Sequence, residues 1–194
     1  MEPIEKLVRD GLLLAASRTY GEQYVEPFVR AKYGLREAIG GDHDGVDEEE
    51  NKYEIKACKV LRSSVNRKVT KSLLERVLYE TTNVATLRSV PFLEAQTASY
   101  DANVQNVKRD HFDFLIYVLL FADSAKIFRV ATNLIASRDF RGWSDKHGRY
   151  DELGKSGQFN VTKTTIQWHL DNYLIDTVSY HEMAGIFLQL SDDN

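Results

Sequence analysis

Apolar residues at helical spacing begin the chain. Residues three and four apart lie on one face of a helix. The first run with this spacing consists of Ile4, Leu7, Val8, Leu12 and Ala15. A second run, from Tyr24 to Lys32, ends just before Gly34, and glycine commonly ends a helix. The pattern therefore predicts two helices within the first 33 residues.

The most apolar run in the chain predicts the centre of a β-sheet. Residues Phe112 to Phe121 read FDFLIYVLLF, which is nearly continuous in apolar, β-forming residues. Such a run is typical of a strand buried on both faces. The turn at Ala122 to Ala125 leads to Lys126–Val130, which we expect to pair with it as a hairpin. Tyr53–Val60 alternates apolar and charged residues, as a further strand does.

The remaining segments mix both kinds of element. Val69–Tyr79 has helical periodicity, whereas Thr81–Asp101 is polar with one proline and is expected to be mostly loop. Gln158–Val161 predicts a short strand, and helices are expected at about Thr164–Leu174 and Ser179–Leu190. Strands and helices together indicate an α/β protein with a mixed central sheet flanked by helices.

Composition favours one domain. The 194 residues, 43% of them hydrophobic, are enough to bury one sizeable core, so residues 1–194 are interpreted as a single domain. The N-terminus lacks a positive region followed by an apolar run, which favours a cytoplasmic protein. Cys58 is the only cysteine, which excludes an intramolecular disulfide and a cysteine-based metal cluster.

Charge is segregated along the chain, although its net value is only −4. Seven carboxylates occupy the thirteen positions from Asp42 to Glu54, and basic residues then dominate from Lys56 to Arg76. Either run alone is most simply a solvated surface. Side by side they suit cleavage of a polyanion, because cations hold phosphates and carboxylates hold a metal ion.

Asp44, Glu54 and Lys56 are the candidate catalytic residues. Alternate side chains of a strand share a face, so Glu54 and Lys56 lie together. A hairpin across the nine intervening residues can bring Asp44 beside Glu54. Two carboxylates suit Mg²⁺, which prefers oxygen ligands, and a lysine can orient a water molecule. Glu50-Asn51-Lys52 has the same spacing but lacks an apolar residue to anchor a strand.

These residues resemble the active-site motif of the PD-(D/E)xK nucleases. The run DGVDEEENKYEIK, with the aromatic Tyr53 before Glu54 and a second aspartate at Asp47, is similar in spacing to type II restriction endonucleases of that superfamily. The segment FDFLIYVLLFADSAKIFRV, followed by a loop with Trp143, resembles the hairpin after their catalytic strand. His43 stands where the superfamily motif has a proline.

The resemblance implies a restriction-endonuclease-like fold and a magnesium-dependent endonuclease that makes double-strand cuts at a short specific DNA sequence. It implies that Asp44, Glu54 and Ile55 hold the metal, Ile55 through its backbone. It also implies a homodimer, with the helices of residues 4–33 as candidate contact, and a cognate DNA methyltransferase as genetic companion. One enzyme of that superfamily contacts the bases of its target with a histidine-rich stretch, and no such stretch follows Lys56 here. The resemblance therefore implies no target sequence.

Two groups of residues are candidates for contact with duplex DNA. Phosphate contacts are expected from cations after the catalytic strand, namely Lys59, Arg62, Arg67, Lys68 and Lys71. Base reading needs amide, hydroxyl and basic side chains, and two segments supply them. These candidates are Asn103, Gln105, Asn106 and Lys108, and Asn160, Thr162, Lys163, Gln167 and His169. For any one of them an exposed side chain without a role is the simpler interpretation.

Two other functions remain open at this point. One is a nuclease of the same fold that acts in repair or on branched DNA. The other is a DNA-binding or interaction protein without catalysis, in which the acidic loop is only solvated surface. The presence of all three of Asp44, Glu54 and Lys56 argues against the second, since a silent protein does not need them.

Overall fold

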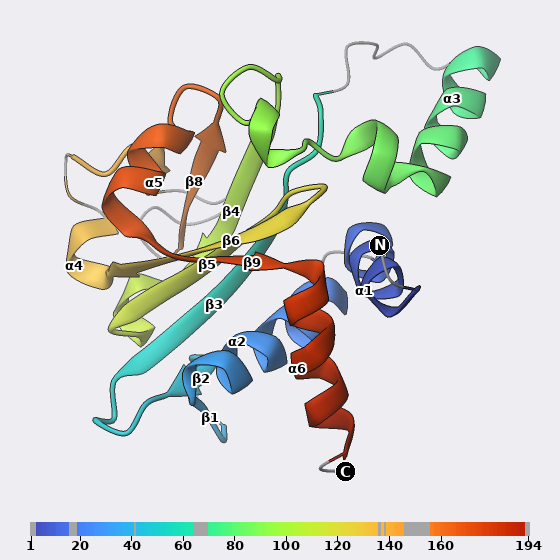
Figure 1. Ribbon diagram of the computed structural model, residues 1–194. Helices are drawn as coiled ribbons and strands as arrows, with labels where there is room; N and C mark the ends of the chain where they lie inside the picture. Colours follow the sequence, from blue (N-terminus) through green and yellow to red (C-terminus); the bar gives the residue numbers. More distant parts are fainter. Residues whose placement is uncertain are drawn as a thin grey trace.

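The structure of the protein is a computed structural model (Figure 1) that describes residues 3–15, 19–40, 42–63, 70–135, 137, 139–145 and 156–192. It is a mixed α/β structure with two sheets and flanking helices. No helix in these ranges combines the length and the apolar character needed to cross a membrane.

The main sheet has six strands in the order β1-β2-β3-β5-β6-β9. Their bounds are β1 Arg36–Glu37, β2 Gly45–Val46, β3 Lys52–Lys59, β5 Phe114–Leu120, β6 Ser124–Ala131 and β9 Leu174–Ser179. Only the pair of β3 and β5 is parallel, and all other pairs are antiparallel. The predicted central strand is confirmed as β5, where every residue from Leu115 to Leu120 is buried. The predicted hairpin of β5 and β6 is also confirmed.

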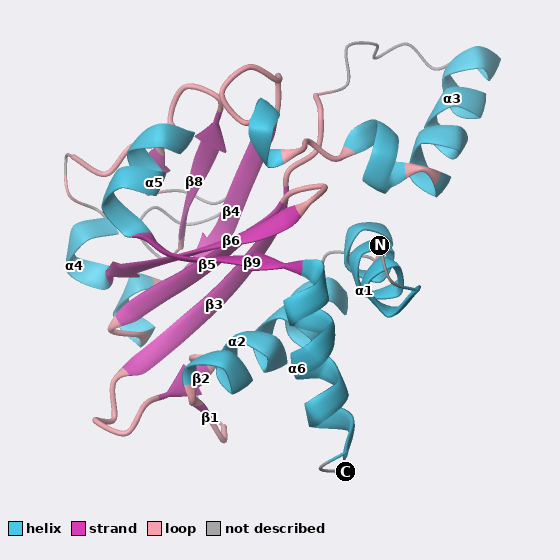
Figure 2. Ribbon diagram, in the orientation of Figure 1, coloured by secondary structure: helices cyan, strands magenta, loops and turns pink. Residues whose placement is uncertain are grey.

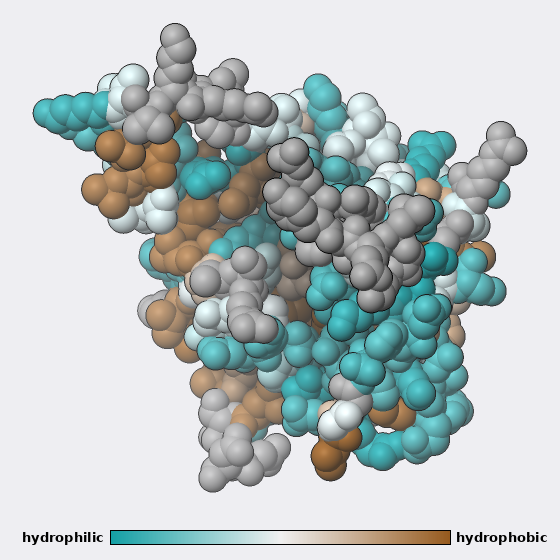
Figure 3. Space-filling view, turned by 180° about the vertical axis from the view of Figure 1, so that it is seen from behind, coloured by the Kyte–Doolittle hydropathy of each residue, from teal (hydrophilic) through white to brown (hydrophobic). Residues whose placement is uncertain are grey.

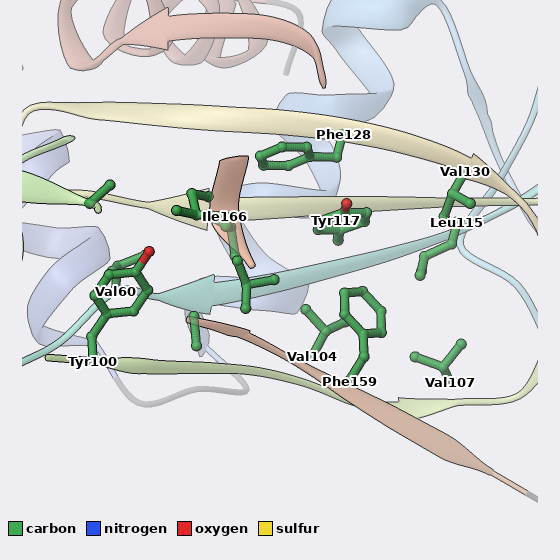
Figure 4. Close-up of a cluster of buried hydrophobic side chains, with 14 of the residues drawn as sticks. Val60, Tyr100, Val104, Val107, Leu115, Tyr117, Phe128, Val130, Phe159 and Ile166 are labelled. Atoms are coloured by element: carbon green, nitrogen blue, oxygen red, sulfur yellow. The ribbon is translucent and has the colours of Figure 1, made fainter. Parts of the chain in front are cut away.

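A second sheet covers one face of the main sheet. It has three strands in the order β4-β8-β7: β4 (Asp101–Val107), β8 (Gly157–Thr162) and β7 (Trp143–Ser144). Val104 and Val107 of β4 and Phe159 of β8 point toward Leu115 and Tyr117 of β5, so the larger apolar core lies between the two sheets (Figure 4). The short helices α4 (Thr132–Ile135) and α5 (Ile166–Tyr173) lie at this side (Figure 2).

Helices cover the opposite face of the main sheet. They are α1 (Pro3–Leu14), the π-helical segment η1 (Thr19–Val25), α2 (Glu26–Tyr33) and α6 (Tyr180–Asp192). Their apolar side chains form a second core with Ile55 of β3 and Ile116 of β5. Both predicted N-terminal helices are confirmed, and α2 ends at Gly34, whose φ of 65° is a left-handed conformation that suits glycine.

The region after β3 differs in part from the prediction. Helix α3 (Lys71–Thr82) is confirmed, but the π-helical segment η2 (Val84–Arg88) and the 3-10 turn η3 (Phe92–Glu94) replace much of the expected loop. Strand β4 and the 3-10 turn η4 (Arg109–His111) follow, and no strand was expected at β4. Its inward residues are apolar but its outward residues are Asp101 and three amides, so its composition is more polar than that of a central strand. Strand β9 was also missed, at the junction of two predicted helices.

Candidate active site

The β2–β3 hairpin brings Asp44 to the catalytic strand. Gly45 pairs with Tyr53, and the backbone N–H of Asp44 donates to the carbonyl of Tyr53 at 2.8 Å. The backbone N–H of Ile55 donates to the Asp44 carboxylate (Oδ2) at 2.7 Å. The Asp44 side chain therefore lies directly over the beginning of β3, and the predicted approach to Glu54 is confirmed.

Glu54 and Lys56 share one face of β3. Ile55 and Ala57 pack into the core beneath the helices, whereas Cys58 packs against the core between the sheets. By strand alternation, Glu54 and Lys56 face the same side as Cys58. The Lys56 ammonium forms an ion pair with Glu54 and lies 3.9 Å from the Asp44 carboxylate. Two carboxylates thus converge on one cation.

Burial and mutual charge determine the protonation of this cluster. The Glu54 side chain is 9% exposed, and burial raises its pKa above the ordinary value although Lys56 opposes the shift. Burial lowers the pKa of Lys56, but the carboxylates of Glu54 and Asp44 outweigh it, and the net pKa is raised. Lys56 is therefore held as an ammonium ion. Asp44 and Lys56 are 24% and 25% exposed, which leaves the cluster accessible from solvent.

A third carboxylate, Glu26 of α2, was missed by sequence reasoning. Burial and then the charge of Asp44 raise the pKa of Glu26 to about 7. Arg30, one helical turn later, lies 4.0 Å from Glu26 and donates to the backbone carbonyl of Asp44 at 3.2 Å. Helix α2 thus fastens the loop that carries Asp44. Nothing in the helical pattern separates Glu26 from an ordinary surface glutamate, because its neighbours are distant in sequence.

The donor set limits the kind of metal site. Within the described ranges, no three His, Cys, Asp or Glu side chains gather as a metal-binding group. The chain provides a pair of carboxylates, Asp44 and Glu54. Both lie near the Lys56 ammonium, and the space between the two carboxylates favours positive charge. Carboxylate oxygens of this kind fit Mg²⁺, which retains much of its water shell and needs few protein ligands.

Asp47 has a structural role. Its carboxylate accepts hydrogen bonds from the backbone N–H groups of Glu49 and Asn51 at 3.0 and 2.9 Å. It also accepts one from the Tyr53 hydroxyl at 3.0 Å. The second aspartate of the motif therefore holds the turn between β2 and β3 and directs its oxygens into that turn.

Lys59, a predicted phosphate contact, does not lie beside the catalytic residues. Lys59 lies on the opposite face of β3, where its ammonium donates to the Ala15 carbonyl and sits 4.4 Å from the centroid of the Tyr20 ring. Burial lowers its pKa to about 8. The reason is strand alternation, since an odd-numbered residue of β3 faces the helices, as Ile55 and Ala57 do.

The other predicted phosphate contacts are dispersed. Arg62 pairs with Glu94 at 2.7 Å, and Lys71, at the start of α3, lies 3.6 Å from Glu75. Arg67 and Lys68 lie outside the described residues. By contrast, Lys108 at the end of β4 is close enough for its charge to act on Glu54. Among the predicted DNA contacts that the structure describes, Lys108 is the one whose charge acts on Glu54.

The predicted base-reading residues of β4 and β8 lie on one sheet. Asn103 pairs in register with Asn160, and the Asn103 amide donates to Gln158 at 3.3 Å. Gln105 and Asn106 are exposed, and Asn106 has a φ of 57° at an irregularity in the pairing. Asn103, Gln105, Asn106 and Asn160, with Thr162 at the end of β8, lie on the outward, polar side of this sheet.

His169 is not a surface residue, and its predicted contact with a base is wrong. It is fully buried, with Nδ1 2.8 Å from the Tyr117 hydroxyl and its ring stacked on Phe159. Burial lowers its pKa to about 4, so the imidazole is neutral in the core. It was misplaced because His169 lies three residues after Ile166, which puts both on the inward face of α5.

The chain was compared with protein families and with individual proteins. No family model, no curated protein and no solved structure matches it.

Proposed function

We propose that the protein is a magnesium-dependent endonuclease that cuts duplex DNA at a short specific sequence, with the fold and motif of the PD-(D/E)xK type II restriction endonucleases. One observation carries the proposal: the carboxylates of Asp44 and Glu54 converge on the Lys56 ammonium at an accessible edge of the sheet. The mixed sheet, with its parallel pair of β3 and β5, is compatible with that fold.

Each residue of the cluster has a distinct task in this proposal. Asp44 and Glu54 would supply carboxylate oxygens to Mg²⁺, with the backbone of Ile55 as a further donor. When bound, the ion would offset the negative charge that develops on the scissile phosphate. Lys56, held as an ammonium ion, would donate hydrogen bonds to a phosphate oxygen or to the attacking water. Glu26 and Arg30 would hold the Asp44 loop in position.

For the cut of both strands we propose a homodimer that presents two such clusters symmetrically to the two strands. Lys108 is the proposed phosphate contact nearest the carboxylates, because its charge acts on Glu54. A cognate DNA methyltransferase encoded nearby would accompany an enzyme of this type.

The decisive experiment is incubation with plasmid DNA and Mg²⁺, followed by sequencing of the fragment ends. We expect ends at one fixed sequence. The variants Asp44→Asn and Glu54→Gln keep shape but remove charge, and each should slow cleavage by about a hundredfold or more. Both should still bind the same site in Ca²⁺. Glu48→Gln, a neutralised exposed acid in the same hairpin, is the matched control and should cut normally.

The outcomes separate the alternatives. Cleavage confined to branched DNA, without fixed ends on plasmid, would indicate a structure-selective or repair nuclease. Binding without cleavage under any divalent ion would indicate a non-catalytic DNA-binding protein. Full activity of folded Asp44→Asn or Glu54→Gln would remove the proposed site.

A further inference from the structure

Helix α3 is an amphipathic helix without a buried residue. It spans Lys71–Thr82, and its N-terminus is capped by Thr70, whose hydroxyl accepts from the Leu73 N–H at 3.0 Å. Leu74, Val77 and Leu78 share one face by helical spacing, and they are 60%, 42% and 68% exposed. Figure 1 shows α3 standing away from both sheets. A helix of this length is marginal in water unless its apolar face is packed.

The exposed apolar residues of the chain gather on the same side. Of the residues that the structure describes, fifteen large hydrophobic side chains are exposed, and ten of them belong to α1, η1, α3, η2 and α6. These ten are Ile4, Leu7, Leu14, Tyr24, Leu74, Val77, Leu78, Tyr79, Leu87 and Leu188. Figure 3 shows apolar surface along the side of the molecule that carries α3 and α1. Exposed apolar area on this scale marks a protein interface.

A groove of matching character lies between α1, η1 and α6. It has a volume of about 560 Å³ and is lined mainly by apolar residues, among them Leu7, Leu12, Tyr24 and Phe187. Helix α3 of the same chain does not enter it, since the lining comes only from α1, η1, α2 and α6. Within the described residues, the chain thus carries both an apolar ridge, formed by the exposed face of α3, and an apolar groove.

The charges of α3 argue against DNA as its partner. Lys71 lies 3.6 Å from Glu75 and Arg76 lies 3.5 Å from Glu80, so the cations of this helix are compensated one for one. Binding to the DNA backbone depends on uncompensated cations that displace counterions. An electrically neutral helix with an apolar face is suited to another protein surface instead.

We propose that a second copy of this chain covers α3, with α3 of each copy lying in the groove between α1, η1 and α6 of the other. A ridge and a groove on one chain are complementary under a two-fold axis, so each contact is made twice. A standard interface buries about 800 Å² on each partner, and ten large apolar side chains, each between 38% and 68% exposed, provide surface of that order. This interface would hold together the homodimer of the proposed function. The observations that support it are the exposed apolar side chains and the groove, not the carboxylate cluster.

The oligomeric state in solution tests this proposal. Analytical ultracentrifugation of the full chain should show a dimer at micromolar concentration. Leu78→Lys on the ridge should weaken dimerisation at least about tenfold. Gly11→Leu should do the same by filling the groove, since Gly11 lines it and a Cβ added at Gly11 meets no neighbouring atom within 4 Å. Leu93→Lys is the matched control, since Leu93 is 93% exposed but lies on η3, outside this surface.

Circular dichroism must show that each variant keeps the wild-type fold. A monomeric wild-type protein at about 100 µM, or a dimer unaffected by both Leu78→Lys and Gly11→Leu, would overturn the proposal. The proposal would also be overturned if the protein were monomeric and Leu78→Lys weakened DNA binding, since α3 would then face DNA. Cleavage by a monomeric protein would refute this interface and leave the proposed nuclease function standing.

Discussion

The carboxylate of Glu26 has a pKa of about 7 because burial and the nearby charge of Asp44 both disfavour its ionised form. The ordinary pKa is 4.5, so the folded state holds this proton more tightly than the unfolded state. The stability that Glu26 contributes is complete below about pH 4.5 and is lost as pH rises through about 7. At alkaline pH the fold retains an unfavourable buried charge at this residue, beside the carboxylate that we assign to the metal.

The variant Glu26→Gln should therefore be more stable than the wild type at pH 8 and gain less at pH 5. The expected gain at pH 8 is about 1–3 kcal/mol, since one pKa unit corresponds to about 1.36 kcal/mol. Urea denaturation at several pH values measures it. Glu48→Gln, at an exposed acid, should show no such pH-dependent gain. Equal effects of the two variants would contradict the assigned pKa of Glu26.

At the scale of elements, two predicted base-reading residues differ in their surroundings: Gln167 lies on α5 and Lys163 in the turn before it. Gln167 is already bonded at both ends, because its amide donates to Asp171 at 2.6 Å and its carbonyl accepts from Gln96 at 2.6 Å. Lys163 is exposed in the turn between β8 and α5. Gln167 would have to give up these partners to read a base, whereas the exposed Lys163 is the better candidate for such a contact.

If this turn enters the major groove, Lys163→Ala should reduce discrimination between the cognate site and a one-base variant by roughly 1–3 kcal/mol. Gln167→Ala should change it less. Affinities measured in Ca²⁺ keep cleavage out of the comparison, and Asn172→Ala on the same helix is the control. An unchanged ratio for Lys163→Ala would remove the turn from the recognition surface and favour Asn103 to Lys108.

At the scale of the whole molecule, the cations of β3 point into two different layers, one on each face of the main sheet. Lys56 faces the side of the second sheet, where Lys108 also lies, while Lys59 points into the helical layer. In the proposed function, DNA at the carboxylate cluster would meet Lys56 and Lys108, and β3 itself would separate the DNA from Lys59. The basic run is therefore continuous along the sequence but not in space.

Salt dependence tests this division. Lys108→Ala should lower the slope of log affinity against log salt by about one unit, because one phosphate contact is lost. Lys59→Met, which keeps most of the apolar stem, should leave the slope unchanged. A loss of slope in Lys59→Met, with none in Lys108→Ala, would place the DNA on the helical face and contradict the proposed site.

The sequence by itself determined the local features of this protein. Apolar runs of the right period predicted α1, α2, β5 and the hairpin with β6, because periodicity records which face of an element is buried. Strand alternation likewise put Glu54 and Lys56 on one side, and the turn after Asp44 brought that carboxylate back to β3. These are relations between residues close in sequence, where backbone geometry leaves few choices.

Only the tertiary structure decided which side chains meet across elements. Glu26 joins the cluster because α2 packs beside the β2–β3 hairpin, and His169 is buried because α5 lies on the core between the sheets. Strand β4 was not predicted, because its partners in β8 lie fifty or more residues later in the sequence and its outward face is polar. Burial and charge at such positions depend on distant neighbours, and a single sequence does not record which neighbours those are.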